Sequence, residues 1–379
     1  MNILFLARSL GQGGAERQLV LLSKGLRQRG HAVSVVVFYG GNTVENDLLS
    51  AGVSVTQLGK GGRWDITSFL WALARAVKRI RPDVLHAYLG VPNVLAVVLK
   101  PLIPCARVVL GVRASSIDWG AYDWAVRWMY RAECLLARLS DLIIANSQSG
   151  LDYAAENGFP RKKMVVVPNG IDVEHFKPSH EARMRVRAQW GVGDKEILIG
   201  LVGRIDPMKD HATFLRAAFR IRKEKAGMRF VCVGDGPDPY KGSMRLLASN
   251  LQLDDVLIWA GARDDVAAVY NAVDVACSSS AFGEGFSNVI GEAMACGTPC
   301  VVTNVGDSAQ IVGELGRVVP PQDPNALASA LLATAEEIVS ENDVAAHARR
   351  ERIVSEFSTA RLIDRTESIL QALVDIPRR

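Results

Sequence analysis

The chain alternates short apolar runs with longer segments whose apolar residues recur at helical spacing. Apolar strands that alternate with helices are typical of a parallel β-sheet covered by helices on both faces. In the first half, helices are expected over residues 16–29 and 67–80, and strands in the runs NILFLA, AVSVVVF, DVLHAYL, RVVLGV, DLIIANS and MVVVPNG. The pattern therefore predicts an α/β fold.

This alternation is interrupted once, from Asp172 to Lys195, where the sequence turns polar and charged, and we interpret this stretch as a linker. Beyond it a helix is expected over residues 211–223, with strands in EILIGLVGR, RFVCVGDG, VLIWAG, VDVACSS and PCVVT. We expect two doubly wound, Rossmann-like domains facing each other across a cleft, because ligands of such folds bind at the carboxyl ends of the strands. The expected domains are residues 1–175, joined by a final helix over 361–379, and residues 176–360.

Composition agrees with a two-domain globular enzyme. The 379 residues exceed what one ordinary core accommodates, and 49% are hydrophobic and 22% charged. No apolar run reaches the length of a membrane-spanning helix, and the N-terminus lacks the basic region of a signal peptide. The six cysteines form no CxxC and the six histidines show no ligand spacing, which favours reduced thiols, a cytoplasmic location and no metal site.

Charge and tryptophan are concentrated in the first half. Residues 1–175 hold 20 Lys and Arg against 13 Asp and Glu, a net +7, and five of the seven tryptophans, whereas the remainder is −3. No nucleic-acid-binding module accompanies this charge. In the segment 119–140, the residues Trp124, Arg127, Trp128 and Arg131 share one helix face. This face either docks on an anionic membrane or packs into the core with its arginines extended to the edge.

Two glutamates flank a predicted helix start in SSSAFGEGFSNVIGEAMACGTP, residues 278–299. Ser287 or Asn288 is the natural N-cap, Glu292 lies about one turn into the helix, and Glu284 precedes it in the loop. Unpaired N–H groups at a helix start attract phosphate, and carboxylates accept hydrogen bonds from hydroxyls. The arrangement fits a nucleotide diphosphate sugar, although a solvated loop glutamate and a surface glutamate would give the same spacing.

A glycine-rich turn follows the first strand. Gly13 and Gly14 lie in GQGGAE and open a helix, which lets backbone N–H groups approach a diphosphate. A dinucleotide fingerprint would need glycine at the position of Glu16, so a dehydrogenase is disfavoured. An ordinary strand-to-helix turn is the alternative.

A cationic pair follows the first strand of the second half. Arg204 and Lys209 lie five residues apart in GRIDPMK, where two positive charges can neutralise a diphosphate. The alternative is surface ion pairing with Asp206 or Asp210.

These motifs together resemble the retaining GT-B glycosyltransferases of glycosyltransferase family 4. The resemblance extends over nearly the whole chain through GQGGAER, VVPNGIDVEHFKP, GRIDPMKDH, VGDGPD and, most specifically, FGEGFSNVIGEAMACGTPCVVT. It implies a donor-binding second domain and an acceptor-side first domain. The residues that it assigns to catalysis are Arg204, Lys209 and Glu284, and those that it assigns to the donor are Gly13, Gly14, Ser287, Asn288, Val289 and Glu292.

The sequence departs from the family pattern in the first domain. Where family members often carry a histidine near the donor sugar, this chain has Arg113, and His86 at the end of the preceding strand is a second candidate. The glutamate of a later family motif is Gln310 here and receives no role. The absence of a D-x-D sequence argues against a metal on the diphosphate.

We therefore expect a metal-independent enzyme that transfers a sugar from a nucleotide sugar, with retention, to a lipid-linked or polysaccharide acceptor. It would need no cofactor and would work in the cytoplasm, at the inner face of the cytoplasmic membrane. A nucleotide-sugar 2-epimerase and a sugar-nucleotide-binding protein without turnover are the alternatives.

Overall fold

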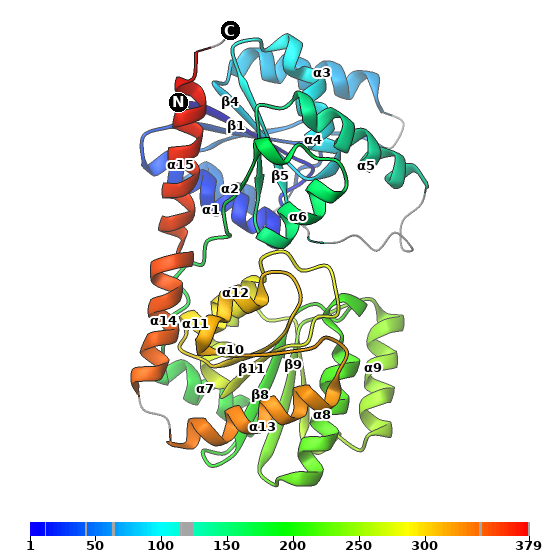
Figure 1. Cartoon of the computed structure of the whole chain (residues 1–379), viewed down its shortest axis with the longest axis vertical. Helices are drawn as coiled ribbons and strands as arrows, with labels where there is room; N and C mark the ends of the chain where they lie inside the picture. The colour runs from blue at the N-terminus through cyan, green and yellow to red at the C-terminus, as the bar shows by residue number, and fades with distance from the viewer. Residues whose placement is uncertain are drawn as a thin grey trace. The chain divides into compact units, whose positions relative to one another are not determined.

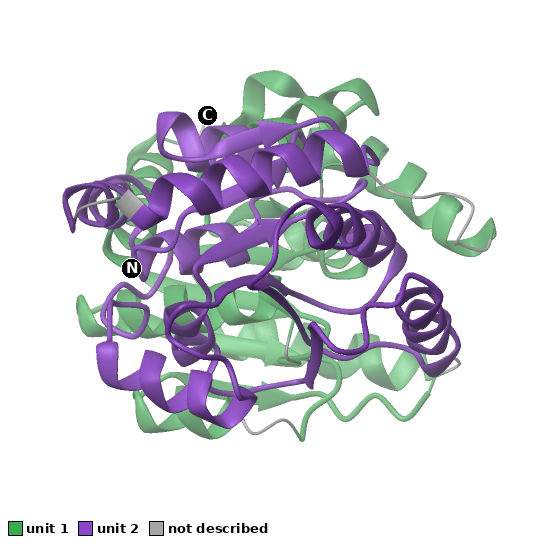
Figure 2. Ribbon diagram, turned by 90° about the horizontal axis from the view of Figure 1, so that it is seen from below, with its two compact units in different colours: residues 1–170, 359–379 green, residues 171–358 purple. Residues whose placement is uncertain are grey.

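The computed structural model describes residues 1–11, 13–41, 44–62, 65–113, 115, 124–340 and 343–377. The chain forms two compact units (Figure 2). Unit 1 comprises Met1–Gly170 and Thr359–Arg379, and unit 2 comprises Ile171–Ser358. The unit boundaries fall after residues 170 and 358, where the sequence analysis expected 175 and 360.

Unit 1 is built on a seven-stranded parallel sheet with the strand order β3-β2-β1-β4-β5-β6-β7 (Figure 1). Its strands are β1 Asn2–Ala7, β2 Ala32–Val37, β3 Ser54–Gln57, β4 Val84–Tyr88, β5 Arg107–Val112, β6 Leu142–Ala145 and β7 Met164–Val166. Its α-helices are α1 Gly14–Gln28, α2 Val44–Ser50, α3 Thr67–Ile80, α4 Gly90–Leu99, α5 Trp124–Leu136, α6 Gln148–Glu156 and α15 Thr359–Asp375. Short 3-10 helices are η1 Lys100–Leu102, η3 Ala137–Leu139 and η4 Arg161–Lys163.

The central strands of unit 1 are mostly apolar because both faces of the sheet are covered. In β1, Ile3 and Phe5 face a core shared with α1 and α15, whereas Leu4 and Leu6 face a core shared with α3 and α4. The final helix α15 packs against α1, where Arg29 forms ion pairs with the carboxylates of Asp364 and Glu367. The last segment of the chain therefore completes the first domain.

Unit 2 contains a six-stranded parallel sheet with the strand order β10-β9-β8-β11-β12-β13. Its strands are β8 Ile197–Val202, β9 Met228–Val233, β10 Leu257–Gly261, β11 Val275–Ser278, β12 Cys300–Thr303 and β13 Arg317–Val319. Its α-helices are α7 His180–Trp190, α8 His211–Glu224, α9 Asp238–Asn250, α10 Val266–Ala272, α11 Asn288–Ala295, α12 Ser308–Val312, α13 Pro324–Ser340 and α14 Asp343–Phe357. Two 3-10 helices are η5 Pro207–Lys209 and η6 Gly313–Leu315.

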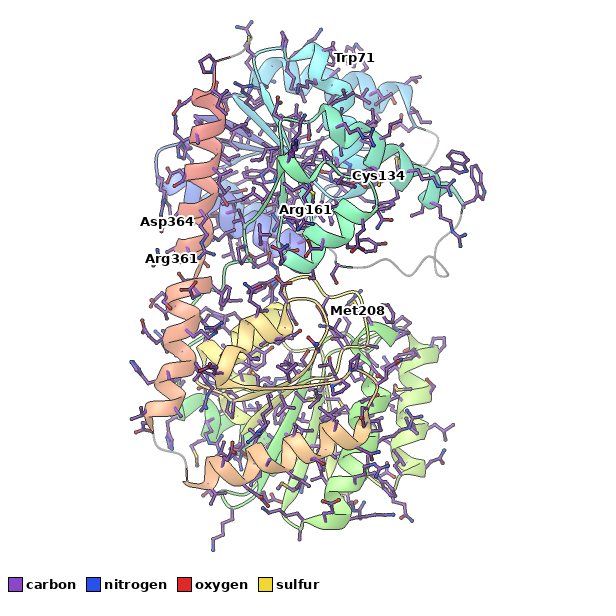
Figure 3. All side chains as sticks on the ribbon, in the orientation of Figure 1. Trp71, Cys134, Arg161, Met208, Arg361 and Asp364 are labelled. Carbon is purple, nitrogen blue, oxygen red and sulfur yellow. The ribbon has the colours of Figure 1, made fainter. Side chains whose placement is uncertain are left out.

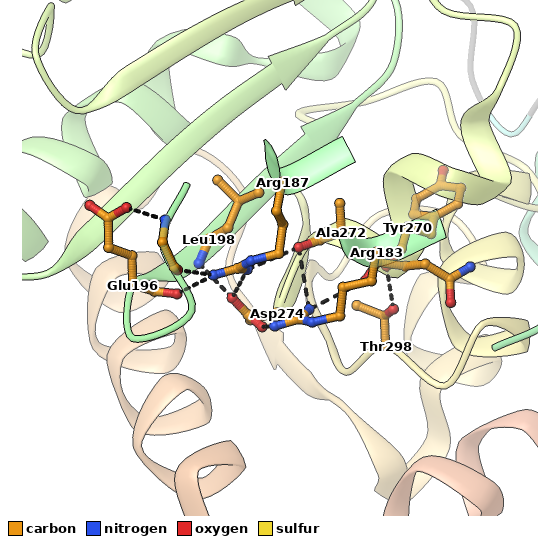
Figure 4. Close-up of polar contacts among 10 residues, drawn as sticks. Arg183, Arg187, Glu196, Leu198, Tyr270, Ala272, Asp274 and Thr298 are labelled. Carbon is orange, nitrogen blue, oxygen red and sulfur yellow. Dashed lines mark hydrogen bonds and ion pairs between the residues drawn. The ribbon is translucent and has the colours of Figure 1, made fainter. Parts of the chain in front are cut away.

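The predicted linker is wrong, because residues 172–195 belong to unit 2 and include the helix α7, which packs on α10. Two arginines fasten this helix to the sheet (Figure 4). Arg183 and Arg187 donate to the Asp274 carboxylate at 2.5 and 2.9 Å, and Arg187 also donates to the carbonyl oxygens of Gly193, Glu196 and Ala272 at 2.6–3.1 Å. Arginines of the stretch that suggested a linker thus form hydrogen bonds and ion pairs with other residues of unit 2.

No helix in the part of the chain that the structure describes is both long and apolar enough to cross a bilayer. The six cysteines are free thiols, of which Cys232, Cys277, Cys296 and Cys300 are buried.

Candidate functional site

The predicted cations and the loop glutamate lie at the topological switch point of unit 2. There β8 has β9 on one side and β11 on the other, so the loops that follow β8 and β11 diverge at the carboxyl edge of the sheet. The loop after β8 carries Arg204 and Lys209, and the loop after β11 carries Glu284. Ligands of doubly wound sheets bind at this place.

Lys209 and Glu284 form a buried ion pair. The Lys209 Nζ atom donates to Glu284 Oε1, and the two side chains are only 12% and 10% exposed. Ser280 Oγ donates to the same carboxylate oxygen at 2.9 Å. The pair joins two loops whose residues are 75 positions apart in the sequence.

Glu284 remains ionised in this environment. Burial alone raises the pKa of its carboxyl, but the Lys209 ammonium, the Ser280 hydrogen bond and the charge of Arg204 outweigh burial and hold the pKa below its ordinary value. The site therefore presents a carboxylate that accepts hydrogen bonds.

Backbone contacts hold the two loops in register. The Ala281 N–H donates to the Met208 carbonyl at 2.8 Å, and Ser279 Oγ donates to the Lys209 carbonyl at 2.8 Å. Beneath the glutamate loop, Gly306 adopts φ +61°, and a Cβ atom there would lie 2.3 Å from the Glu284 carbonyl oxygen. Only glycine fits this position, so the loop rests directly on the backbone below it.

Arg204 differs from Lys209 in its exposure. Its side chain is 73% exposed and forms an ion pair with Asp206 at 3.0 Å, which is the surface pairing that the sequence left open. Its charge still lowers the pKa of Glu284. Arg204 is thus a solvent-accessible cation beside a buried ion pair.

The helix after the glutamate loop begins as predicted, with Ser287 at the N-cap and Asn288 as the first residue of α11. The Ser287 side chain makes no capping bond, and its buried hydroxyl has no hydrogen-bond partner among the described residues. Val289 lies in the first turn. A buried hydroxyl and the N–H groups of a helix start can together bind an anionic oxygen.

Glu292 lies in the same helix and is 6% exposed. Its Oε2 atom accepts a hydrogen bond of 3.3 Å from the hydroxyl of Tyr270, a fully buried residue of α10. Tyr270 fixes one oxygen of the carboxylate and thereby its orientation. This contact could not be predicted from the sequence, because nothing in the local pattern of α10 distinguishes Tyr270 from another core residue.

The glycine-rich turn of unit 1 lies at the corresponding switch point of its own sheet, where β1 has β2 and β4 as neighbours. Gly13 is the N-cap of α1, with its carbonyl accepting from the Arg17 N–H at 3.1 Å, and Gly14 is the first helical residue. A Cβ atom on Gly13 would lie 2.2 Å from the Glu16 carboxylate oxygen. The side chain of Glu16 therefore occupies the space that the glycine leaves.

His86 and Arg113 are brought together in unit 1. His86 is fully buried in β4, and neither ring nitrogen has a hydrogen-bond partner among the described residues. Burial, with a smaller effect of the Arg113 charge, lowers the pKa of His86 to about 3. Arg113 follows β5, where it lies over the Tyr88 ring at 4.4 Å and donates to Asn169 Oδ1 at 3.2 Å. His86 is thus a neutral core residue, and Arg113 carries the charge of this group.

The structure therefore places the predicted site residues in three groups. Unit 2 brings together Lys209 and Glu284, with Arg204 nearby, and places Glu292 in the helix that follows. Unit 1 holds Gly13 and Gly14 in one turn, and His86 and Arg113 in a separate group. Within the described residues, no three His, Cys, Asp or Glu side chains lie together as a metal site requires.

Two family models match the two halves of the chain. Residues 12–175 match the model described as Glycosyltransferase Family 4, and residues 196–337 match the model described as Glycosyl transferases group 1. Each match lies almost entirely within one structural unit.

Several proteins are similar to this chain over most of its length. A D-inositol 3-phosphate glycosyltransferase of Kribbella flavida is 28% identical, over 85% of this chain and 82% of its own length. A phosphatidyl-myo-inositol mannosyltransferase of Mycobacterium tuberculosis is 29% identical, over 92% and 88%. The crystal structure of Anabaena Alr3699/HepE in complex with UDP-glucose superimposes with a TM-score of 0.85 at 22% identity, over 98% of this chain and 99% of that chain.

The comparisons agree with the observed architecture. Two parallel-sheet, Rossmann-like domains are the GT-B fold of the superimposed structures. The chain is a glycosyltransferase of this fold, with a family 4 domain in its first half and a group 1 domain in its second.

Proposed function

We propose that this chain transfers a sugar from a nucleotide diphosphate sugar to an acceptor hydroxyl, with retention of anomeric configuration and without a metal ion. The observation that carries the proposal is the buried Lys209–Glu284 ion pair at the switch point of unit 2. It supplies an ionised carboxylate for sugar hydroxyls and an ammonium for a diphosphate in one place.

Departure of the nucleotide diphosphate is the difficult step of this reaction, because negative charge develops on the leaving oxygen. Positive charge and N–H donors at that oxygen stabilise the transition state more than the ground state. In the proposed site Arg204 and Lys209 provide the charge, and Ser287 with the N–H groups of Asn288 and Val289 provides the donors.

The two carboxylates are proposed to bind different parts of the donor nucleotide sugar. Glu284 accepts from hydroxyls of the sugar, and the Tyr270 bond holds Glu292 to accept from hydroxyls of the ribose. Arg113 is the proposed acceptor-side residue, and the fully buried His86 would support it from the core without touching the acceptor. With a pKa of about 3, His86 would act there as a neutral residue.

Retention follows if bond breaking and bond making occur on one face of the sugar. The bond between the anomeric carbon and the diphosphate oxygen breaks, and a bond to the acceptor oxygen forms on the same face. The acceptor proton passes to the departing phosphate oxygen. This chemistry needs no protein base, which fits a sugar-proximal carboxylate already paired with Lys209.

The names of the similar proteins support a proposal for the donor and the acceptor. The Anabaena structure contains UDP-glucose, and the relatives are named for an inositol phosphate and a phosphatidyl-inositol acceptor. We propose a UDP- or GDP-sugar as donor and a lipid-linked or polysaccharide acceptor, used in the cytoplasm at the membrane.

Product analysis tests this proposal. Thermal shift with UDP- and GDP-sugars identifies the donor, and the radiolabelled donor is then incubated with lipid and saccharide acceptors with and without EDTA. We expect a new glycoside at equal rates in both. An isomerised donor would indicate the epimerase, unchanged donor a binding protein, and loss of activity in EDTA with recovery in magnesium a metal-dependent enzyme.

A further inference from the structure

The helix α5 of unit 1 directs its tryptophans outward. Trp124 and Trp128 are 74% and 61% exposed, and Arg127 and Arg131 on the same face are exposed as well. The core-facing interpretation of this stripe is therefore wrong. The beginning of the predicted segment, residues 119–123, lies outside the described residues.

A buried network fixes which face of α5 points outward. Glu133, the buried residue of the helix, accepts from Asn93 Nδ2 of α4 at 2.7 Å. Asn93 also exchanges two hydrogen bonds with the backbone of Gly111 in β5, at 3.0 and 3.3 Å. Helix, neighbouring helix and sheet are thus joined on the inner side, so the opposite face stays exposed.

The exposed side of α5 borders an open groove of about 750 Å³ that extends to the end of α6. Arg127, Arg131 and Arg138 line it together with Tyr130 and the apolar side chain of Leu135. Among the described residues that line the groove, Glu156 is the one carboxylate. Three arginines line this groove, and a guanidinium group can donate two parallel hydrogen bonds to a phosphate.

We propose that this surface docks unit 1 on a membrane and holds the phosphate of an anionic phospholipid headgroup in the groove. The docking surface consists of Trp124, Arg127, Trp128, Arg131, Leu135 and Arg138. Indole rings favour the interfacial layer of a bilayer, and the arginines can bind lipid phosphates at the same depth. In the structure Arg131 lies over the Trp128 ring at 5.3 Å, which places charge and ring side by side.

The helix α3 also carries an exposed tryptophan and basic residues, which favours a lipid surface over a small protein contact. It contributes to the same core as α4 and η3, and its exposed Trp71 carries Arg75 over its ring at 5.2 Å (Figure 3). Across α3, α4 and α5 there are five basic residues and one acidic residue, the buried Glu133. An anionic bilayer matches an excess of basic residues of this kind.

The test is flotation of the full chain with vesicles of phosphatidylcholine alone or with 30% phosphatidylglycerol, at low and high salt and without nucleotide sugar. Binding is thereby measured separately from transfer activity. We expect binding to the anionic vesicles that weakens with salt. The variant Arg127→Gln/Arg131→Gln/Arg138→Gln should bind them about a hundredfold more weakly. The variant Trp124→Ser/Trp128→Ser should lose quenching of its fluorescence by brominated lipid.

A matched control is Arg216→Gln/Arg220→Gln/Lys223→Gln, which removes three exposed cations from α8 of unit 2 and should bind like the wild type. Circular dichroism verifies that each variant is folded. The proposal is overturned if the wild type binds no vesicles or binds neutral and anionic vesicles equally. It is also overturned if the control variant loses as much affinity for anionic vesicles as the arginine variant does. Self-association that the tryptophan variant abolishes, without vesicle binding, would instead identify a second copy as the occupant.

Discussion

The Lys209 ammonium and the Glu284 carboxylate are each other's ion-pair partner, and both side chains are about nine-tenths buried. A buried charge that loses its partner costs far more than an exposed one, whereas removing both charges together costs little. The pair therefore makes a prediction about stability that is independent of the proposed reaction.

Lys209→Met should lower the free energy of unfolding by roughly 3 kcal/mol, because it leaves Glu284 buried without its cation. The double variant Lys209→Met/Glu284→Gln should recover much of this loss. Urea unfolding of the wild type, both single variants and the double variant measures the coupling. Additive losses would contradict a pair that is coupled in the folded protein.

Arg204→Ala should lower turnover by roughly a hundredfold, since it removes a cation from the leaving diphosphate. The free energy of unfolding should stay within about 0.5 kcal/mol of the wild type, because the side chain is mostly exposed. Initial rates at saturating donor, together with urea unfolding, check both statements. Turnover equal to that of the wild type would show that Arg204 does not stabilise the leaving diphosphate.

Glu292→Ala should act on donor affinity, because the proposed role of Glu292 is to bind ribose hydroxyls. Tyr270→Phe removes only the hydroxyl that holds this carboxylate and should weaken nucleotide binding by roughly fivefold. Calorimetry with the nucleoside diphosphate and its 2′,3′-dideoxy analogue tests the role. If both variants still prefer the ribose form as strongly as the wild type does, the assignment fails.

The lowered pKa of the buried His86 predicts that the stability of the protein depends on pH. Its pKa is about 3 in the folded protein and about 6.5 when unfolded, so the unfolded state binds a proton that the folded state does not. The contribution of neutral His86 to the free energy of unfolding is fully present above about pH 6.5 and is lost as the pH falls toward about 3. Denaturation from pH 7 to 4 should show a shallower decline for His86→Phe than for the wild type. Parallel declines would show that His86 is solvated or hydrogen-bonded.

Local patterns predicted the fold and the start of the helix α11 well. The helix over residues 67–80 has the predicted bounds, and Ser287, Glu292 and the start of α11 follow from capping and spacing within a few residues. The short edge strands β3 and β13 were missed, because each has only a few residues and β3 carries polar side chains.

Contacts between distant residues could not be read from local patterns. The Lys209–Glu284 pair joins loops 75 positions apart, and Tyr270 approaches Glu292 from another helix. The helix α7 appeared to be a linker because the partner of its arginines, Asp274, is far along the chain. For α5, spacing placed the tryptophans and arginines on one face, but only the packing of Glu133 decides that this face is exposed.

The central claim is retaining transfer from a nucleotide sugar. Its most direct measurement is ¹H NMR of the glycoside formed from an α-linked donor, followed from the first turnover so that later anomerisation is not counted. The account predicts an α-glycoside, identified by the small coupling of its anomeric proton. A β-glycoside would contradict it, because the leaving diphosphate and the acceptor would then have occupied opposite faces of the sugar.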